Sequence, residues 1–107
     1  MSSSPNSHLY VAVSVFEVAN ERDDAVAEAF IRRPQLVENA PGFVSLEVLR
    51  NHQNPRLFWL ITRWTDDTSY RTWHRGHTYK SAHRGIPRGL KLVPGTARVH
   101  EFAQVCL

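Results

Sequence analysis

The chain has 107 residues, which is enough for one domain with a single core and too few for two such domains. Hydrophobic residues make up 42% of it and charged residues 21%, a balance that excludes an intrinsically disordered chain. The net charge of +3 and the pI of about 9.5 come with no recognised base-stacking motif or groove-fitting helix, so we expect no nucleic-acid partner.

The single cysteine favours a reduced, cytoplasmic setting. Cys106 has no second cysteine with which to form an intramolecular disulfide, and we expect it to be a small buried hydrophobe. No apolar run approaches the ~20 residues that span a bilayer, so we expect no membrane partner. Residues 1–8 are rich in Ser, Pro and Asn and lack the features of a secretory signal, which predicts a disordered tail before one domain over residues 9–107.

The first predicted element is a strand over residues 9–18, which is β-branched and apolar on both faces. One face carries three valines, Val11, Val13 and Val15, and the other carries Tyr10, Ala12, Ser14, Phe16 and Val18. The strand is therefore expected to be buried on both sides.

Helical spacing begins at Asp24, with one stripe formed by Val26, Phe30, Arg33 and Val37. Asp23 or Asp24 is predicted to cap its start. Because Pro34 removes an amide donor and clashes with the preceding turn, we predict a kink or a break near Arg33.

Residues 41–42 (Pro-Gly) end this helix, and alternating strands are predicted over residues 43–50 and 57–64, joined by a turn over residues 51–56. Thr65, Asp66 and Asp67 are predicted to cap a second helix that Gly76 interrupts. A loop over residues 85–95 leads to a fourth strand over residues 97–105.

The order β-α-β-β-α-β predicts an α+β, ferredoxin-like fold with a four-stranded antiparallel sheet. Two helices cover only one face of such a sheet, and we expect the uncovered face to expose Tyr10, Phe16 and the aromatic residues of the third strand. A second copy of the sheet is the economical cover for that face, so we predict a homodimer.

The stretch from Trp73 to His83, W-x-x-G-x-x-Y-x-x-A-H, places an indole and a metal-capable imidazole near the end of the second helix. Six basic residues between positions 71 and 91 would suit an anionic ligand. Taken alone, Trp73 is typical of core packing and His83 of a surface residue near a helix end. The six histidines lack the spaced Cys or carboxylate cluster of a zinc site, and no Ser-His-Asp constellation is present.

Four segments together resemble the antibiotic biosynthesis monooxygenase superfamily of dimeric α/β barrels and, within it, the IsdG-type haem-degrading monooxygenases. These segments are VAVSVFEV in the first strand, VENAPGFVSLEVLR around the proline-glycine turn, WLITRW in the third strand and WHRGHTYKSAH at the helix end. The resemblance covers about residues 9–105, nearly the whole chain.

The resemblance implies an oxygen-dependent monooxygenase for which haem is both cofactor and substrate, with an external electron donor and release of iron. His83 matches the axial ligand of the haem iron, and Trp73 matches the tryptophan that presses on the porphyrin. Phe30 and Arg33 match positions on the first helix, where Arg33 would meet a haem propionate. Tyr79 belongs to the same matching segment and is expected to contact the haem.

Ser14 stands where the family has a catalytic asparagine. A serine hydroxyl is also a donor, but it is shorter than an amide and can bond to nearby backbone. Two alternatives therefore stay open. One is a cofactor-free monooxygenase that oxidises a phenolic or quinone-like compound, with Trp73, Tyr79 and Ser14 lining the cavity and His83 as a general base or lining group. The other is a non-catalytic module that binds haem.

Overall fold

The structure is a computed structural model and describes residues 8–32, 37–75 and 92–106. Its elements follow the predicted β-α-β-β-α-β order, with one extra 3-10 turn. They are β1 (Tyr10–Glu17), α1 (Asp23–Ile31), η2 (Val37–Asn39), β2 (Phe43–Arg50), β3 (Leu57–Trp64), α2 (Asp67–Arg75) and β4 (Arg98–Ala103). None of the helices in these described stretches is long and apolar enough to cross a bilayer.

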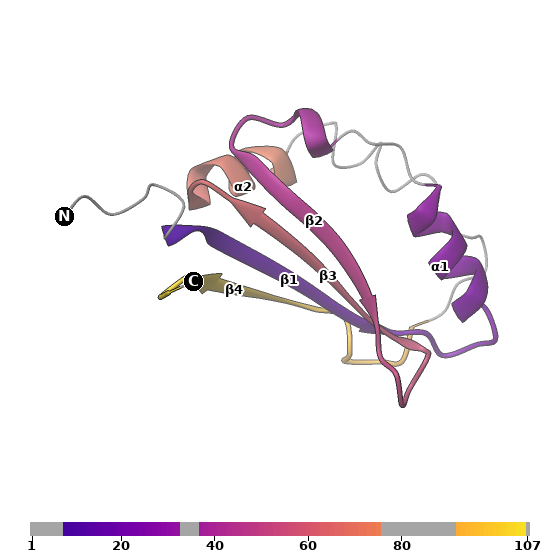
Figure 1. The fold of residues 1–107 in the computed structure, drawn as a ribbon. Helices are drawn as coiled ribbons and strands as arrows, with labels where there is room; N and C mark the ends of the chain where they lie inside the picture. The colour runs from indigo at the N-terminus through magenta and orange to yellow at the C-terminus, as the bar shows by residue number, and fades with distance from the viewer. Residues whose placement is uncertain (1–7, 33–36, 76–91, 107) are drawn as a thin grey trace.

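The four strands form one antiparallel sheet in the order β2-β3-β1-β4. This order places β1 and β3 at the centre and confirms the ferredoxin-like fold. Both helices lie on the same side of the sheet, with α1 over one end and α2 over the other (Figure 1).

Apolar side chains on the helix-covered face form two separate clusters. The α2 cluster lies where β1 begins and β3 ends, and it consists of Ala12, Val37, Trp64 and Tyr70 with Tyr10, Ala40, Phe43, Leu46 and Trp73 packed against them. The α1 cluster lies at the other end of the sheet, and it consists of Val18, Val26 and Phe58 with Phe16, Ala27, Phe30 and Val48 packed against them. The core is therefore divided in two, with one helix for each half.

The prediction that Tyr10 and Phe16 would be exposed on the uncovered face is wrong. Tyr10 lies 5.7 Å from Tyr70 of α2 between ring centroids, and Phe16 lies 6.1 Å from Phe30 of α1. Both side chains therefore point toward the helices. The strand is apolar on both faces, so its pattern defined the two faces but not which of them the helices cover.

The opposite, uncovered face of the sheet is called here the open face. Three of its large side chains are about half exposed: Leu49 at 45%, Trp59 at 46% and Phe102 at 53%. Val13 and Ile61 pair across the two central strands on this face, and both are buried. Of the third-strand aromatic residues, only Trp59 is exposed as expected, because Phe58 and Trp64 face the helices and are buried.

The first helix differs from its prediction at both ends. Arg22 holds the N-cap position without a side-chain hydrogen bond, whereas Asp23 and Asp24, predicted as caps, lie in the first turn. The helix ends at Ile31, in agreement with a break near Arg33, and residues 33–36 lie outside the described residues. Val37, expected on the same stripe as Val26, lies instead in η2 and packs in the α2 cluster.

The turn before β2 interlocks with the start of α2. Gly42 has a φ of 80°, and its carbonyl oxygen accepts a hydrogen bond from the Thr65 amide at 2.8 Å. A Cβ atom at Gly42 would lie 2.2 Å from the Ser69 Oγ atom and 2.8 Å from the Thr65 Oγ1 atom, so only glycine fits.

Asp66 caps α2, as the Thr65-Asp66-Asp67 run predicted. Its Oδ1 atom accepts a hydrogen bond from the Ser69 amide at 2.7 Å, and this bond, together with the Ser69 hydroxyl, lowers the pKa of Asp66.

Near the C-terminus Cys106 is exposed, so the prediction of a buried thiol is wrong. Cys106 lies beyond Ala103, the last residue of β4, and no strand or helix of the described residues covers it.

Candidate functional site

The candidate site is the middle of the helix-covered face, between the two clusters. Ser14 stands there on β1, between Ala12 of the α2 cluster and Phe16 of the α1 cluster. Its register partners are Leu60 on β3 and Val99 on β4. Val99 lies on the sheet face that carries both helices, yet its side chain is 48% exposed. The described helices therefore cover the ends of this face, and neither cluster includes Ser14, Leu60 or Val99.

Trp73 borders this region from the α2 side. Its half-buried indole lies 5.6 Å from the Trp64 ring between centroids, with the two planes tilted by 35°. Trp64 is completely buried, and its Nε1–H donates a hydrogen bond to the Thr62 hydroxyl at 2.9 Å. Phe43 packs edge-on against the same ring at 5.6 Å. The third-strand tryptophan is thus a rigid support behind Trp73 and not itself a wall of the site.

Phe30 borders the region from the α1 side. Its ring is half-buried and lies 6.1 Å from the Phe16 ring and 6.3 Å from the Phe58 ring between centroids. Phe16 and Phe58 stack on each other at 5.4 Å. Phe30 and Trp73 therefore belong to different clusters, and the structure places Ser14 between those clusters along the sheet.

Three of the predicted site residues, Arg33, Tyr79 and His83, lie outside the described residues. Their roles stay predictions. Within residues 8–32, 37–75 and 92–106, no group of three or more His, Cys, Asp or Glu side chains is placed to hold a metal ion.

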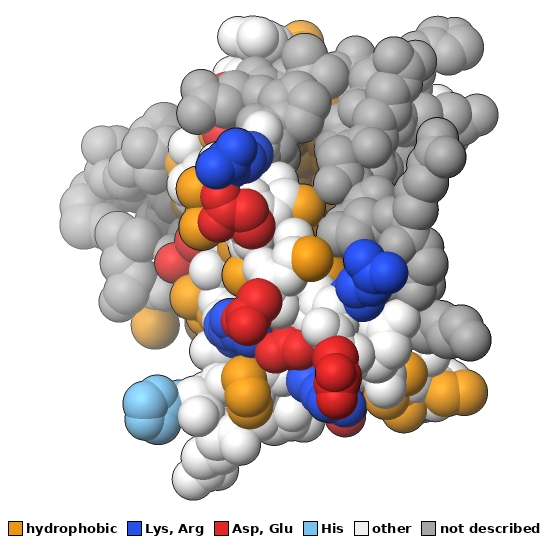
Figure 2. Space-filling model, turned by 90° about the vertical axis from the view of Figure 1, so that its right-hand side faces the viewer, with side chains coloured by type: hydrophobic (Ala, Val, Ile, Leu, Met, Phe, Trp, Pro, Cys, Tyr) orange, Lys and Arg blue, Asp and Glu red, His pale blue; other side chains and the backbone are white. Residues whose placement is uncertain are grey.

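Around α1, basic and acidic side chains of the described residues are interspersed, and two arginines there form ion pairs, Arg32 with Glu28 and Arg50 with Asp23 and Asp24. Figure 2 shows acidic and basic side chains next to one another on the α1 side of the molecule. Near α2, the Arg71 guanidinium pairs with Asp67 and, at 3.6 Å, with Glu101 of β4, and it lies 6.0 Å from the Tyr10 ring centroid. The positive charge of Arg71, the first residue of the predicted basic segment, is therefore balanced by ion pairs with two nearby carboxylates.

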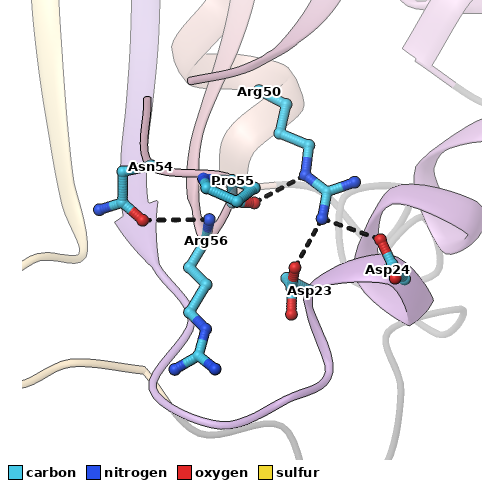
Figure 3. Close-up of polar contacts among 6 residues, drawn as sticks. All are labelled: Asp23, Asp24, Arg50, Asn54, Pro55 and Arg56. Carbon is cyan, nitrogen blue, oxygen red and sulfur yellow. Dashed lines mark hydrogen bonds and ion pairs between the residues drawn. The ribbon is translucent and has the colours of Figure 1, made fainter. Parts of the chain in front are cut away.

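Sequence reasoning missed Arg50. Its side chain reaches from the end of β2 to both aspartates of the first turn of α1 and to the carbonyl oxygen of Pro55 (Figure 3). The hydrogen bond to Asp24 is the largest cause that raises the pKa of Arg50. The only signal in the sequence was the pair of acidic residues predicted as helix caps, which does not identify an arginine 26 residues from Asp24.

Comparison with known proteins places this arrangement in a family. The chain is 28% identical over 75 residues, which is 70% of each chain, to a mycobilin-producing haem oxygenase of Mycobacterium tuberculosis. Among solved structures, the haem-degrader MhuD of M. tuberculosis, with two haems bound in its active site, matches with a TM-score of 0.69 and 26% identity over 87% of this chain and 92% of MhuD.

A third comparison shows the same fold with different chemistry. SnoaB, a cofactor-independent oxygenase of Streptomyces nogalater, matches with a TM-score of 0.69 and 21% identity over 89% of this chain and 91% of SnoaB. The family model for antibiotic biosynthesis monooxygenases matches residues 9–85, well over half of the chain. The chain therefore belongs to the antibiotic biosynthesis monooxygenase family.

Proposed function

We propose that the protein binds haem and degrades it in an oxygen-dependent monooxygenase reaction. The observation that carries this proposal is the middle of the helix face, which the described helices leave uncovered, with Trp73 and its Trp64 support on one side and the Ser14 hydroxyl within it. A flat, largely apolar molecule suits a region with aromatic borders and an exposed Val99 beside it. The similarity to haem-degrading relatives supports haem as that molecule.

In this proposal His83 ligates the haem iron and Trp73 presses on the porphyrin face. Phe30 and Tyr79 add apolar contacts, and Arg33 pairs with a propionate. Bound haem supplies the iron at which dioxygen is activated, while an external donor supplies electrons. The work of the chain is to hold the ring, keep bulk water away from it and offer a hydrogen-bond donor.

Ser14 is the donor in this proposal. It is half-buried on the central strand β1 and faces the uncovered region, where its O–H can donate toward a bound ligand. Its short side chain limits that reach compared with the asparagine that the resemblance implies at this position. We therefore propose that Ser14 supports turnover weakly.

The test of binding is a titration of the protein with hemin, followed by the Soret absorption band. We expect saturation near one haem per chain and loss or displacement of the band in a His83→Ala variant. A matched control is His100→Ala, because His100 lies on the open face beside Val13, on the other side of the sheet. An unchanged band in His83→Ala, or an equal change in His100→Ala, would contradict the role of His83.

The test of turnover adds ascorbate in air, with catalase present to remove free peroxide. Loss of the Soret band with release of iron is the expected result. A stable ferrous spectrum would instead support a haem-binding module without turnover. If hemin gives no specific band, cofactor-independent oxygenation of an aromatic compound becomes the better-supported function, because SnoaB has the same fold.

The open face supports a homodimer as the working form. Leu49 pairs with Trp59 across β2 and β3, Trp59 pairs with Val15, and Phe102 pairs with Val11, so apolar side chains extend across all four strands. No helix of the described residues covers them. Two copies that join these faces would bury them under twofold symmetry.

A further inference from the structure

We propose that Arg50 is a positioning residue, which holds the first turn of α1 on the β2–β3 hairpin and thereby fixes Phe30 at the edge of the site. The part of this inference that concerns the ligand rests on the proposed function. The part that concerns α1 rests on the contacts of Arg50 alone.

Arg50 joins three parts of the chain with one guanidinium group (Figure 3). Its Nη2 atom donates to Asp23 Oδ2 at 2.6 Å and to Asp24 Oδ1 at 2.9 Å. Its Nε atom donates to the Pro55 carbonyl oxygen in the hairpin turn at 2.7 Å. A planar guanidinium can serve these acceptors together because its donors are fixed in one fork, which an ammonium group does not offer.

Apart from these contacts, few interactions of the described residues hold α1 against the sheet. It spans nine residues, whereas isolated helices shorter than about 12 residues are marginal in water. Its N-cap residue Arg22 makes no side-chain capping bond, and Val26 is its only fully buried side chain. Ile31 at its end is 78% exposed. The two aspartates bound by Arg50 are therefore a main attachment of α1.

The same guanidinium is connected to Phe30 through Phe58. It lies 5.5 Å from the centroid of the Phe58 ring, a cation–π arrangement. Phe58 in turn lies 6.3 Å from Phe30 and stacks on Phe16. Loss of Arg50 would release the first turn of α1 and remove the cation beside the ring against which Phe30 packs.

The experiment compares Arg50→Gln with Arg63→Gln, at a protein concentration where both have the oligomeric state of the wild type. Arg63 is a matched control because its side chain is 36% exposed, against 32% for Arg50, and pairs with Glu47 at 3.0 Å on the open face. In ligand-free protein we expect amide hydrogen exchange over residues 26–31 to become about tenfold faster in Arg50→Gln and to stay unchanged in Arg63→Gln.

A double-mutant cycle then connects Arg50 to the site. Arg50→Gln is expected to weaken hemin binding about fivefold in the wild-type background and hardly at all when Phe30 is already alanine, because residues that act through one another are not additive. Asp24→Asn, at an exposed position, should weaken hemin binding in the same way but to a smaller extent. This variant replaces Arg50→Gln in the experiment if Arg50→Gln folds poorly.

The outcomes separate the two proposals. Equal exchange over residues 26–31 in the Arg50 and Arg63 variants overturns the role of Arg50 in holding α1. Equal losses of hemin affinity with and without the Phe30 side chain overturn its connection to the site. Absence of a hemin band in the wild type counts against the proposed function, and the exchange rates then decide the role of Arg50 in α1 by themselves.

Discussion

At the scale of single residues, Ser14 is the proposed hydrogen-bond donor of the site. The alternation of β1 placed Ser14 on the face of Tyr10 and Phe16, and the structure shows that this face lies beneath the helices, although the sequence had predicted it to be the uncovered one. Alternation along the strand was enough to group Ser14 with Tyr10 and Phe16, since side chains two residues apart share a face, but it did not show which face the helices cover.

Replacement of Ser14 by asparagine is expected to accelerate loss of the Soret band under ascorbate several-fold. An amide reaches further from β1 than a hydroxyl and keeps a donor pointing into the uncovered region. Ser14→Ala removes the hydroxyl group and should slow the reaction. An identical rate in all three proteins, measured at saturating hemin, would exclude Ser14 from the mechanism.

Gly42 gives a second prediction at this scale. Gly42→Ala combines a positive φ with contact against Ser69 and Thr65, so we expect a loss of about 2–4 kcal/mol in the free energy of unfolding. Gly95 has the same φ of 80° with open space around it, and Gly95→Ala should cost only ~1 kcal/mol. Denaturant titrations measure both. Equal losses would show that the contact with α2 contributes nothing.

At the scale of elements, periodicity predicted the strands and the hairpin because a local pattern determines them. The bounds of β2 and β3 agree with the predicted residues 43–50 and 57–64. The start of α1 was predicted less well, since the carboxylates of Asp23 and Asp24 bind Arg50, which is distant in sequence. A long-range partner of this kind leaves no trace in local spacing. For the same reason, the strand face of Ser14 was predictable from local alternation, whereas the contacts of Arg50 were not.

The cap of α2 predicts a specific response to acid. The hydrogen bonds from Ser69 lower the pKa of Asp66 in the folded protein, so its contribution to stability is full above the ordinary aspartate pKa of about 3.9 and is lost as the pH falls through the lowered value. Asp66→Asn keeps an acceptor for the Ser69 amide but cannot titrate. Melting temperatures measured from pH ~5 to ~2 should fall more steeply in the wild type than in this variant. Parallel curves would contradict the assignment.

At the scale of the whole molecule, the open face is the proposed interface of a homodimer. We expect Trp59→Glu to weaken a homodimer by about 2 kcal/mol or more, because an exposed aromatic at the centre of an interface contributes strongly and a buried unpaired carboxylate opposes it. Ile31→Glu is the control, since Ile31 is exposed on α1, away from the open face. Sedimentation velocity measures both. A monomeric wild type at high concentration would rule the dimer out.

The division of the core also bears on how a large flat molecule could enter. Among the described residues, no helix is shared between the α1 cluster and the α2 cluster, and the sheet is what joins the two clusters. Cooperative units of this kind open separately. We therefore expect that one end of the molecule can open for a large flat ligand while the other end keeps its packing.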